Sequence, residues 1–423
     1  MAQSKAAAPA PEIGHISEHA TDMQLWNQGE RVPELQWPRS IEVYSRMPRE
    51  DGRAASVLQA IGLPVRRTTW RLAQNGASDE VTDFVALNLG LPREGAEPGD
   101  MPRRRGRFSW AQHLRNALLS LKYGHSYFEQ VYRYDEETGL IMLHKLAPRP
   151  SRTISDIMVA PDGGLISIKQ HPPTQAGRVV HGLRGVEIPV SKLVAYVRDP
   201  EPGDWIGESI LRPAYKHWIL KDEFMRVQAG TARRNGMGVP VGTASKSDDQ
   251  KEVDHMRDLA SNYKGGDHSG VGLANGQTLT LEGVKGNLPD MQPPINFHDK
   301  SIALAALAHF LNLDRGGSHA LASVQADVFT QSVQTYAESI QDIANAHIVE
   351  DLVDINFGEN VPAPRIIFDE IGSQQDATAA ALAILVQNDL LEPDEALRVT
   401  LRQKYRLPAP DRDPSKNDEG DSE

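Results

Sequence analysis

Residues 205–242 form a long stretch with helical periodicity and no strand-type alternation, which limits the folds open to the chain. Pro213 suits the first turn of a helix, and Gly236 suits a left-handed stop at its end. Apolar residues recur at steps of three and four and form one stripe: Leu211, Ala214, Tyr215, Trp218, Met225, Ala229 and Ala232. Such a helix would be roughly 35–40 Å long. A rod with one narrow apolar stripe needs a partner helix, and residues 296–313 are the candidate.

The composition narrows the possible functions. The chain has 423 residues, enough for two or three compact units. It has no Cys, which excludes disulfides, thiol nucleophiles and Cys-based metal sites and fits a reducing cytoplasm. Lys and Arg total 45 against 57 Asp and Glu, for a net charge of −12, the opposite of a tight nucleic-acid binder. The sequence contains no long apolar run and no basic leader, so we expect neither a membrane span nor a signal peptide.

Two motifs flank the first rod and resemble a known family. G-E-S-I-L-R-P-A occupies residues 207–214, and R-R-N-G-M-G-V-P-V-G occupies residues 233–242. This pattern resembles phage portal proteins, and most closely the branch found in Mu-like phages. Further positions match that family in the first half of the chain: Arg53, Ser56, Leu58, Ala60, Ile61, Trp70, Gly124, Ser126 and Glu129. The resemblance covers about residues 39–407.

The resemblance implies an α+β portal fold with a wing, a long-helix stem, a small α/β clip, a tunnel loop and a helical crown, assembled as a ring. The expected divisions are a disordered arm (1–20), wing (21–207), first stem helix (208–235), clip (236–295), second stem helix (296–313), tunnel loop (314–320), long wing helix and strand (321–372), crown (373–410) and disordered acidic tail (411–423).

Periodicity and turn residues predict the local elements. Asp51 should cap a helix, and an alternating strand should include Val65 and Trp70. Residues 109–123 predict one amphipathic helix, followed by a hairpin and further strands of one small antiparallel sheet. In the clip, Ser247 or Asp248 should cap a helix. Residues 321–357 predict a single long helix, and two helices should follow at 376–387 and 394–405.

A search for catalytic constellations finds little chemistry. Phosphate-binding loops, nucleophile elbows and H-E-x-x-H are absent, so we expect no enzyme and no cofactor. Asp254, His255 and Asp258, with Asp267 and His268 nearby, are the best metal candidates, but residue 255 points about 100° away from residues 254 and 258 on a helix. A metal-dependent hydrolase that uses Asp254, His255 and Asp258 is nevertheless one alternative. Another phage neck or connector protein is a second.

The resemblance implies a ring of about twelve copies at one capsid vertex of the virion, assembled in the host cytoplasm. Its expected partners are further copies of the chain, double-stranded DNA passing without sequence specificity, the large terminase, the major capsid or scaffold protein, and neck or adaptor proteins, with no membrane. The candidate DNA-channel residues are Lys300, Asp314, Arg315, Gly316, Gly317, Ser318 and His319. Weak, repeated contacts suit a duplex that must slide.

Overall fold

The computed structural model describes residues 30–96, 108–172, 174–175, 178–179, 185–246, 248–263, 270–282, 290–305 and 319–372. Helices and antiparallel strands are both present among these residues and stand largely in separate runs, which confirms the α+β class. The chain forms two compact units. The first takes its described residues from Met1–Val43, Leu58–Ser209 and Ser318–Glu423, and the second takes them from Tyr44–Val57 and Ile210–Gly317.

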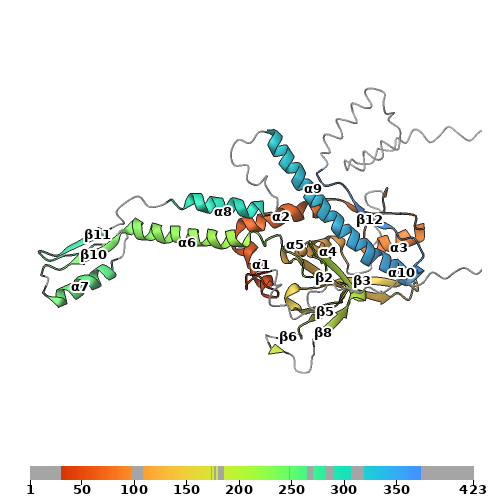
Figure 1. Cartoon of the computed structure of the whole chain (residues 1–423), viewed down its shortest axis with the longest axis horizontal. Helices are drawn as coiled ribbons and strands as arrows, with labels where there is room; N and C mark the ends of the chain where they lie inside the picture. Colours follow the sequence, from red (N-terminus) through yellow and green to blue (C-terminus); the bar gives the residue numbers. More distant parts are fainter. Residues whose placement is uncertain are drawn as a thin grey trace, which may run out of the picture. The chain divides into compact units, whose positions relative to one another are not determined.

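Two three-stranded antiparallel sheets form the centre of the first unit (Figure 1). One has the order β3-β2-β9, built from β3 (Ile141–Arg149), β2 (His125–Tyr134) and β9 (Leu193–Val197). The other has the order β4-β5-β8, built from β4 (Ile154–Val159), β5 (Leu165–Gln170) and β8 (Val186–Pro189). The expected single sheet is therefore wrong, because β9 pairs with β2 and not with the strands just before it. A shared core joins the sheets: Tyr127, Ile154, Leu165, Ile168, Ile188 and Leu193.

Local sequence signals explain the helices around these sheets. The helix α3 (Asp79–Leu89) begins after Ser78, whose hydroxyl accepts from the Val81 amide, and ends at the left-handed Gly90. The helix expected at 109–123 is divided at Leu118 into α4 (Trp110–Ala117) and α5 (Leu119–Tyr123). The remaining short elements are β1 (Trp70–Ala73), which pairs with β12 (Arg365–Phe368), β6 (Thr174–Gln175), which pairs with β7 (Arg178–Val179), and 3₁₀ turns at Ser151–Thr153 and Val190–Lys192.

The long helix near the end of the described chain is interrupted. It consists of α9 (His319–Ala344), a π-helical turn (Asn345–Val349) and α10 (Glu350–Phe357). The Asn345 side chain accepts from the Ile366 amide of β12 at 2.8 Å and donates to the Ile366 carbonyl at 3.3 Å. A π turn accommodates one extra residue in a helix. The prediction of one regular helix is thus wrong at this turn, where Asn345 bonds a distant strand.

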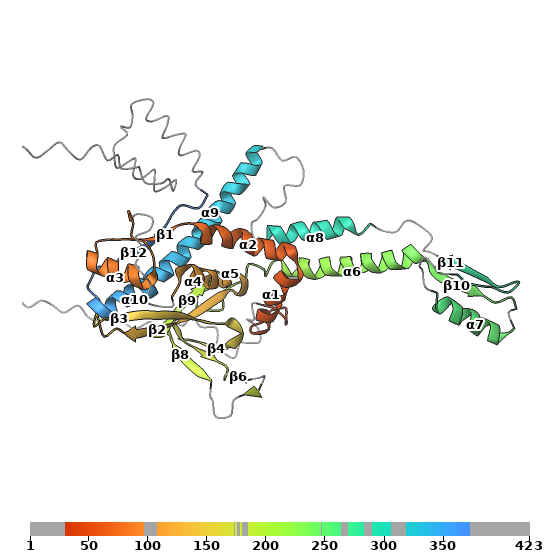
Figure 2. The ribbon, with the colours of Figure 1, turned by 180° about the vertical axis from the view of Figure 1, so that it is seen from behind.

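The second unit contains a pair of helices and a small tip (Figures 1 and 2). The helices α6 (Tyr215–Met237) and α8 (Gln292–Leu304) lie side by side. The turn between α1 (Arg39–Glu50) and α2 (Gly52–Arg67) also belongs to this unit. The tip consists of β10 (Val239–Thr243) paired with β11 (Thr278–Glu282), and α7 (Gln250–Ser261) packs against β10.

Several predicted boundaries need correction. The helix α8 begins at Gln292, before the expected start near residue 296, because Pro293 and Pro294 suit a first turn. The cap of α7 is Asp249, not Ser247 or Asp248. Val65 lies in α2, which extends to Arg67, and not in a strand. The helices expected at 376–387 and 394–405 lie outside the described residues.

Candidate channel and assembly elements

Most of the surface of α6 is uncovered. Its packing in the unit is concentrated at its beginning, where Tyr215 and Trp218 are buried together with Leu211 and Ala214 just before it. Between residues 219 and 233 no side chain is buried. Four apolar side chains of this stretch are between 38% and 49% exposed: Ile219, Leu220, Met225 and Val227. Because apolar surface is unfavourable in water, this part of the helix is suited to contact another protein surface.

Charged side chains tie the beginning of α6 to its neighbours. Lys221 Nζ lies 2.8 Å from Asp51 Oδ2 and 2.6 Å from Asp299 Oδ1. Arg53 forms a second ion pair with Asp299, at 2.6 Å. Asp51 also caps α2, as expected, by accepting from the Arg53 and Ala54 amides. The cluster therefore fixes the α1–α2 turn to both long helices.

In this cluster, the hydrogen bonds and neighbouring charges together shift the pKa values more than burial does. Burial disfavours the charged Lys221 ammonium, but its hydrogen bonds to Asp299 and Asp51 raise the pKa above the usual lysine value. Burial likewise opposes ionisation of Asp299, while Lys221 and Arg53 lower its pKa. The cluster is consequently charged at neutral pH. It weakens when acid protonates Asp299 or strong base neutralises Lys221.

The tip depends on one close approach and one carboxylate. A Cβ on Gly242 of β10 would lie 2.8 Å from the carbonyl oxygen of Met256, so only glycine lets α7 pack this closely. Glu252 accepts hydrogen bonds from the Ser245 hydroxyl and the Gln277 amide. These bonds, together with further ones from backbone amides, lower the pKa of Glu252 to about 2. Glu252 therefore joins α7 to the segment that follows β10 and to the residue that precedes β11.

Two glycines of the family motifs cross each other in the first unit. Gly124 and Gly207 have positive φ angles of 88° and 65°. A Cβ on Gly124 would lie 2.5 Å from the Gly207 carbonyl oxygen, and one on Gly207 would lie 2.6 Å from that of Gly124. Neither position has room for a methyl group, and L residues rarely adopt these angles.

Side chains of the same motifs stabilise this crossing. Ser209 donates to the Lys122 carbonyl at 2.6 Å, and Ser126 donates to the Asn116 carbonyl at 2.9 Å. His125 bonds the Ile206 carbonyl through Nδ1 at 2.8 Å. The motif positions Gly124, Ser126, Gly207 and Ser209 therefore have structural roles. The resemblance of the sequence to the family identified these residues, but it did not reveal the contact between Gly124 and Gly207.

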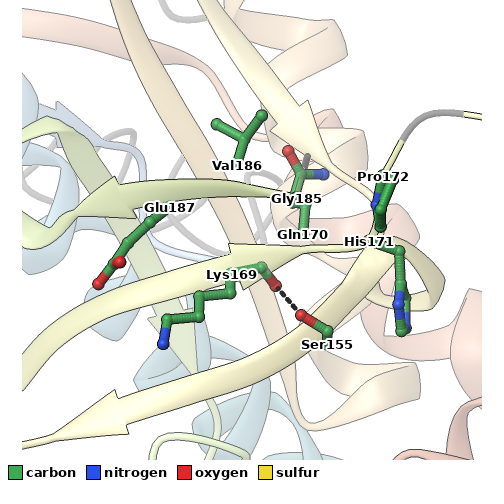
Figure 3. A pocket seen from close by; sticks show the side chains of 8 residues that line it. All are labelled: Ser155, Lys169, Gln170, His171, Pro172, Gly185, Val186 and Glu187. Atoms are coloured by element: carbon green, nitrogen blue, oxygen red, sulfur yellow. Dashed lines mark hydrogen bonds between the residues drawn. The ribbon is translucent and has the colours of Figure 1, made fainter. Parts of the chain in front are cut away.

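A shallow pocket lies at one end of the β4-β5-β8 sheet (Figure 3). Its volume is about 270 Å³, and its lining includes Lys169, His171 and Glu187. Figure 3 shows Lys169 and Glu187 extending to one side while His171 lies on the other. Ser155 donates to the Lys169 carbonyl at 3.2 Å, so its hydroxyl is bound to the backbone. The arrangement offers no nucleophile next to a base.

The structure describes only part of the predicted channel set. Lys300 is an exposed residue of α8, and His319 begins α9. Residues 314–318, which hold Asp314, Arg315, Gly316, Gly317 and Ser318, lie outside the described residues. The assignment of these residues to a channel therefore stays a prediction.

The residues of the hydrolase alternative do not form a metal site. The Arg257 guanidinium lies 3.2 Å from Asp254 and 3.2 Å from Asp258, so it occupies the two carboxylates. Across the described parts of the chain, no three His, Cys, Asp or Glu side chains gather to hold a metal ion. The hydrolase interpretation thus lacks a ligand set among the described residues, and Asp267 and His268 lie outside them.

Solved structures share this fold. One, described as the neck of an empty gene transfer agent (GTA) particle computed with C6 symmetry, matches with a TM-score of 0.53 and 11% identity over 86% of this chain and 94% of that chain. A chain from the virion of a native GTA particle matches with a TM-score of 0.53, 13% identity and the same coverage. A neck of the native particle computed with C12 symmetry gives a TM-score of 0.52 and 12% identity, covering 86% and 93%.

The family match is more specific than the fold. A sequence model of the portal protein of Mu bacteriophage matches residues 41–407, which is most of the chain. This range includes Gly124, Gly207, the helices α6 and α8, and the tip. It favours the portal interpretation over another neck or connector protein. The chain belongs to the family of portal proteins of Mu bacteriophage.

Proposed function

We propose that copies of this portal chain form a ring at one capsid vertex of the virion, with α6 and α8 lining a channel for double-stranded DNA. In this assembly α6 and α8 are the stem, the tip is the clip, and the first unit is the wing. About twelve copies build the ring. DNA enters under the action of the terminase and later leaves through the same channel. The capsid or scaffold protein and the neck or adaptor proteins are the other partners.

The uncovered surface of α6 is the observation that carries the ring. None of the side chains of α6 from residue 219 to residue 233 is buried, and although Lys221 and Phe224 contact α8, much of this stretch is open to a neighbouring copy. Neighbouring copies in a ring would cover Ile219, Met225 and Val227. The fold shared with a particle neck computed with C12 symmetry supports the same arrangement.

The charge of the chain supports a passage in which DNA is not held tightly. Each copy contributes a net charge of −12, so a ring repeats this acidic balance. Affinity for duplex DNA depends largely on cations that neutralise phosphates. Lys300 and the predicted loop around Arg315 are our candidates for weak, repeated contacts.

Among the described helices, none is both long and apolar enough to cross a bilayer.

The ring is tested with the purified full-length chain by sedimentation velocity and negative-stain electron microscopy. The native chain should give rings with a central hole. Met225→Glu should weaken association at least about tenfold, or about 1.4 kcal/mol, because it places a charge in the apolar contact. Met225→Leu keeps an apolar side chain of similar volume at the same position and should leave the rings intact.

Two outcomes would contradict the proposal. A native chain that sediments as a monomer at every concentration excludes the ring. Rings of unchanged stability in Met225→Glu would exclude α6 from the contact between copies. Circular dichroism of both variants checks that the subunit itself stays folded.

A further inference from the structure

Two histidines face each other across α6 and α8. The Nδ1 atoms of His217 and His298 are 3.0 Å apart, the distance of a hydrogen bond. Their ring centroids are 5.3 Å apart, which exceeds the Nδ1–Nδ1 distance by about two ring radii. Each Nδ1 therefore lies close to the line between the ring centres. The two nitrogens meet head-on, as a donor and an acceptor do.

This alignment distinguishes a hydrogen bond from a shared metal ion. Two imidazoles that bind one metal direct their lone pairs to a common third point, at an angle set by the metal. In His217 and His298 the nitrogens instead point at each other. One ring must then carry its proton on Nδ1 and donate, while the other carries its proton on Nε2 and accepts.

The proton count of this contact is limited. A first added proton can bind Nε2 of the donor ring, and the resulting imidazolium still donates through Nδ1, now more strongly. A second added proton must bind Nδ1 of the acceptor ring. Two N–H groups and two positive charges would then face each other at 3.0 Å. The pair therefore tolerates one proton and is broken by the second.

The surroundings of the pair disfavour its charged forms. His298 is buried, at 8% exposure, with Phe224 stacked on it and the edge of Phe297 against it. Burial is the main cause that lowers the pKa of both histidines below the usual value, and Lys216 on α6 adds to it. Across the helices, Asp51 and Asp299 already pair with Lys221, and Arg53 with Asp299, while Lys300 is an exposed cation of α8.

We propose that His217 and His298 form an acid-sensitive latch between α6 and α8, closed with one shared hydrogen bond and opened by double protonation. The latch is a property of the folded subunit and goes beyond the proposed ring and channel. Because folding lowers the pKa of both residues, the contact contributes fully above the free histidine pKa of about 6.5 and is lost as the pH falls through the lowered pKa at which the second proton binds.

The latch can be measured directly because the chain has no Cys. Introduced cysteines at exposed Glu223 of α6 and exposed Asn296 of α8 would carry spin labels in the full-length protein. Pulsed electron paramagnetic resonance would measure the distance between the two spin labels from about pH 7.5 to about pH 4.5. Labels diluted among unlabelled copies report distances within one subunit. We expect a shift to longer distances in acid.

Variants separate the latch from other effects of acid. His217→Asn/His298→Asn replaces the pair by amides that hydrogen-bond without titrating and should abolish the shift. His255→Asn removes an exposed histidine of α7 and should retain it. An unchanged distance in the native chain, or the same shift in the double variant, would overturn the latch. So would a loss of far-ultraviolet dichroism at the same pH, which would indicate general unfolding.

Discussion

Lys221 shows how one side chain can hold three segments of the chain together. Its ammonium group contacts Asp51 at the cap of α2 and Asp299 on α8, and it belongs to α6 itself. The Lys221 side chain is 13% exposed, and that of Asp51 is 7% exposed, so solvent screens the pair only weakly. A buried carboxylate that loses its partner keeps the cost of burial without its compensation.

We therefore expect Lys221→Met to destabilise the protein by about 3 kcal/mol, because two carboxylates lose a shared cation while the aliphatic volume is kept. Urea-induced unfolding of the full-length chain would measure this change. Arg226→Ala is the matched control on the same helix, since its pair with Asp222 is exposed and should contribute less than about 1 kcal/mol. Equal effects of the two substitutions would contradict the role of the cluster.

At the scale of elements, the sequence predicts those whose signals are local. Asp51 caps α2, as expected, and the local residues Ser78 and Gly90 mark the two ends of α3. The predictions of secondary structure fail where contacts with residues far away in the sequence determine the local conformation. The sequence places Val65 in a strand, but it lies in α2 and is fully buried. The π turn depends on the bond between Asn345 and Ile366, which periodicity within the helix cannot reveal.

The candidate site divides in the same way. The helical stripe predicts α6, but the turn residues misplace its ends, because the helix begins at Tyr215, after Pro213, and continues through Gly236 to Met237. The contacts of Lys221 and of His217 join residues from separate segments, so only the fold brings them together. The meeting of Gly124 with Gly207 is likewise a long-range contact, although both residues stand in motifs that the sequence makes visible.

The π turn gives a prediction at the scale of elements. Asn345→Ala removes both side-chain bonds to Ile366 and leaves a buried backbone amide without its partner. We expect a loss of about 2 kcal/mol in the free energy of unfolding, measured by urea denaturation. Gln331→Ala, at an exposed position of α9, should change stability by no more than about 0.5 kcal/mol. A neutral Asn345→Ala would mean that the turn does not depend on this strand.

At the scale of the whole molecule, the two units divide the work of the proposed ring. The first unit contains the two sheets, the crossing glycines and the long interrupted helix. The second contains the exposed rod, the ion-pair cluster and the tip. The acidic balance belongs to the chain as a whole, and its consequence for DNA is a property of the assembled protein.

We expect the purified protein to bind a short DNA duplex no more tightly than about 10⁻⁶ M at physiological salt, because its net charge is −12 and phosphate neutralisation dominates affinity. Fluorescence anisotropy at several salt concentrations would measure this. Lys300→Ala should reduce the salt dependence by about one ion if this residue meets the duplex. Binding that is much tighter and depends on sequence would contradict a channel through which DNA slides.

The two strands of the tip meet where the chain enters and leaves it. Val239 at the start of β10 lies opposite Glu282 at the end of β11. Within the tip, the Met256 backbone lies close to Gly242 of β10, and Glu252 accepts hydrogen bonds from Ser245 and Gln277 beside the two strands. The chain therefore enters and leaves the tip at two residues that are paired with each other in the sheet. Because its two ends stay paired with each other, the tip could be replaced or changed in length as one unit while α6 and α8 keep their positions beside each other.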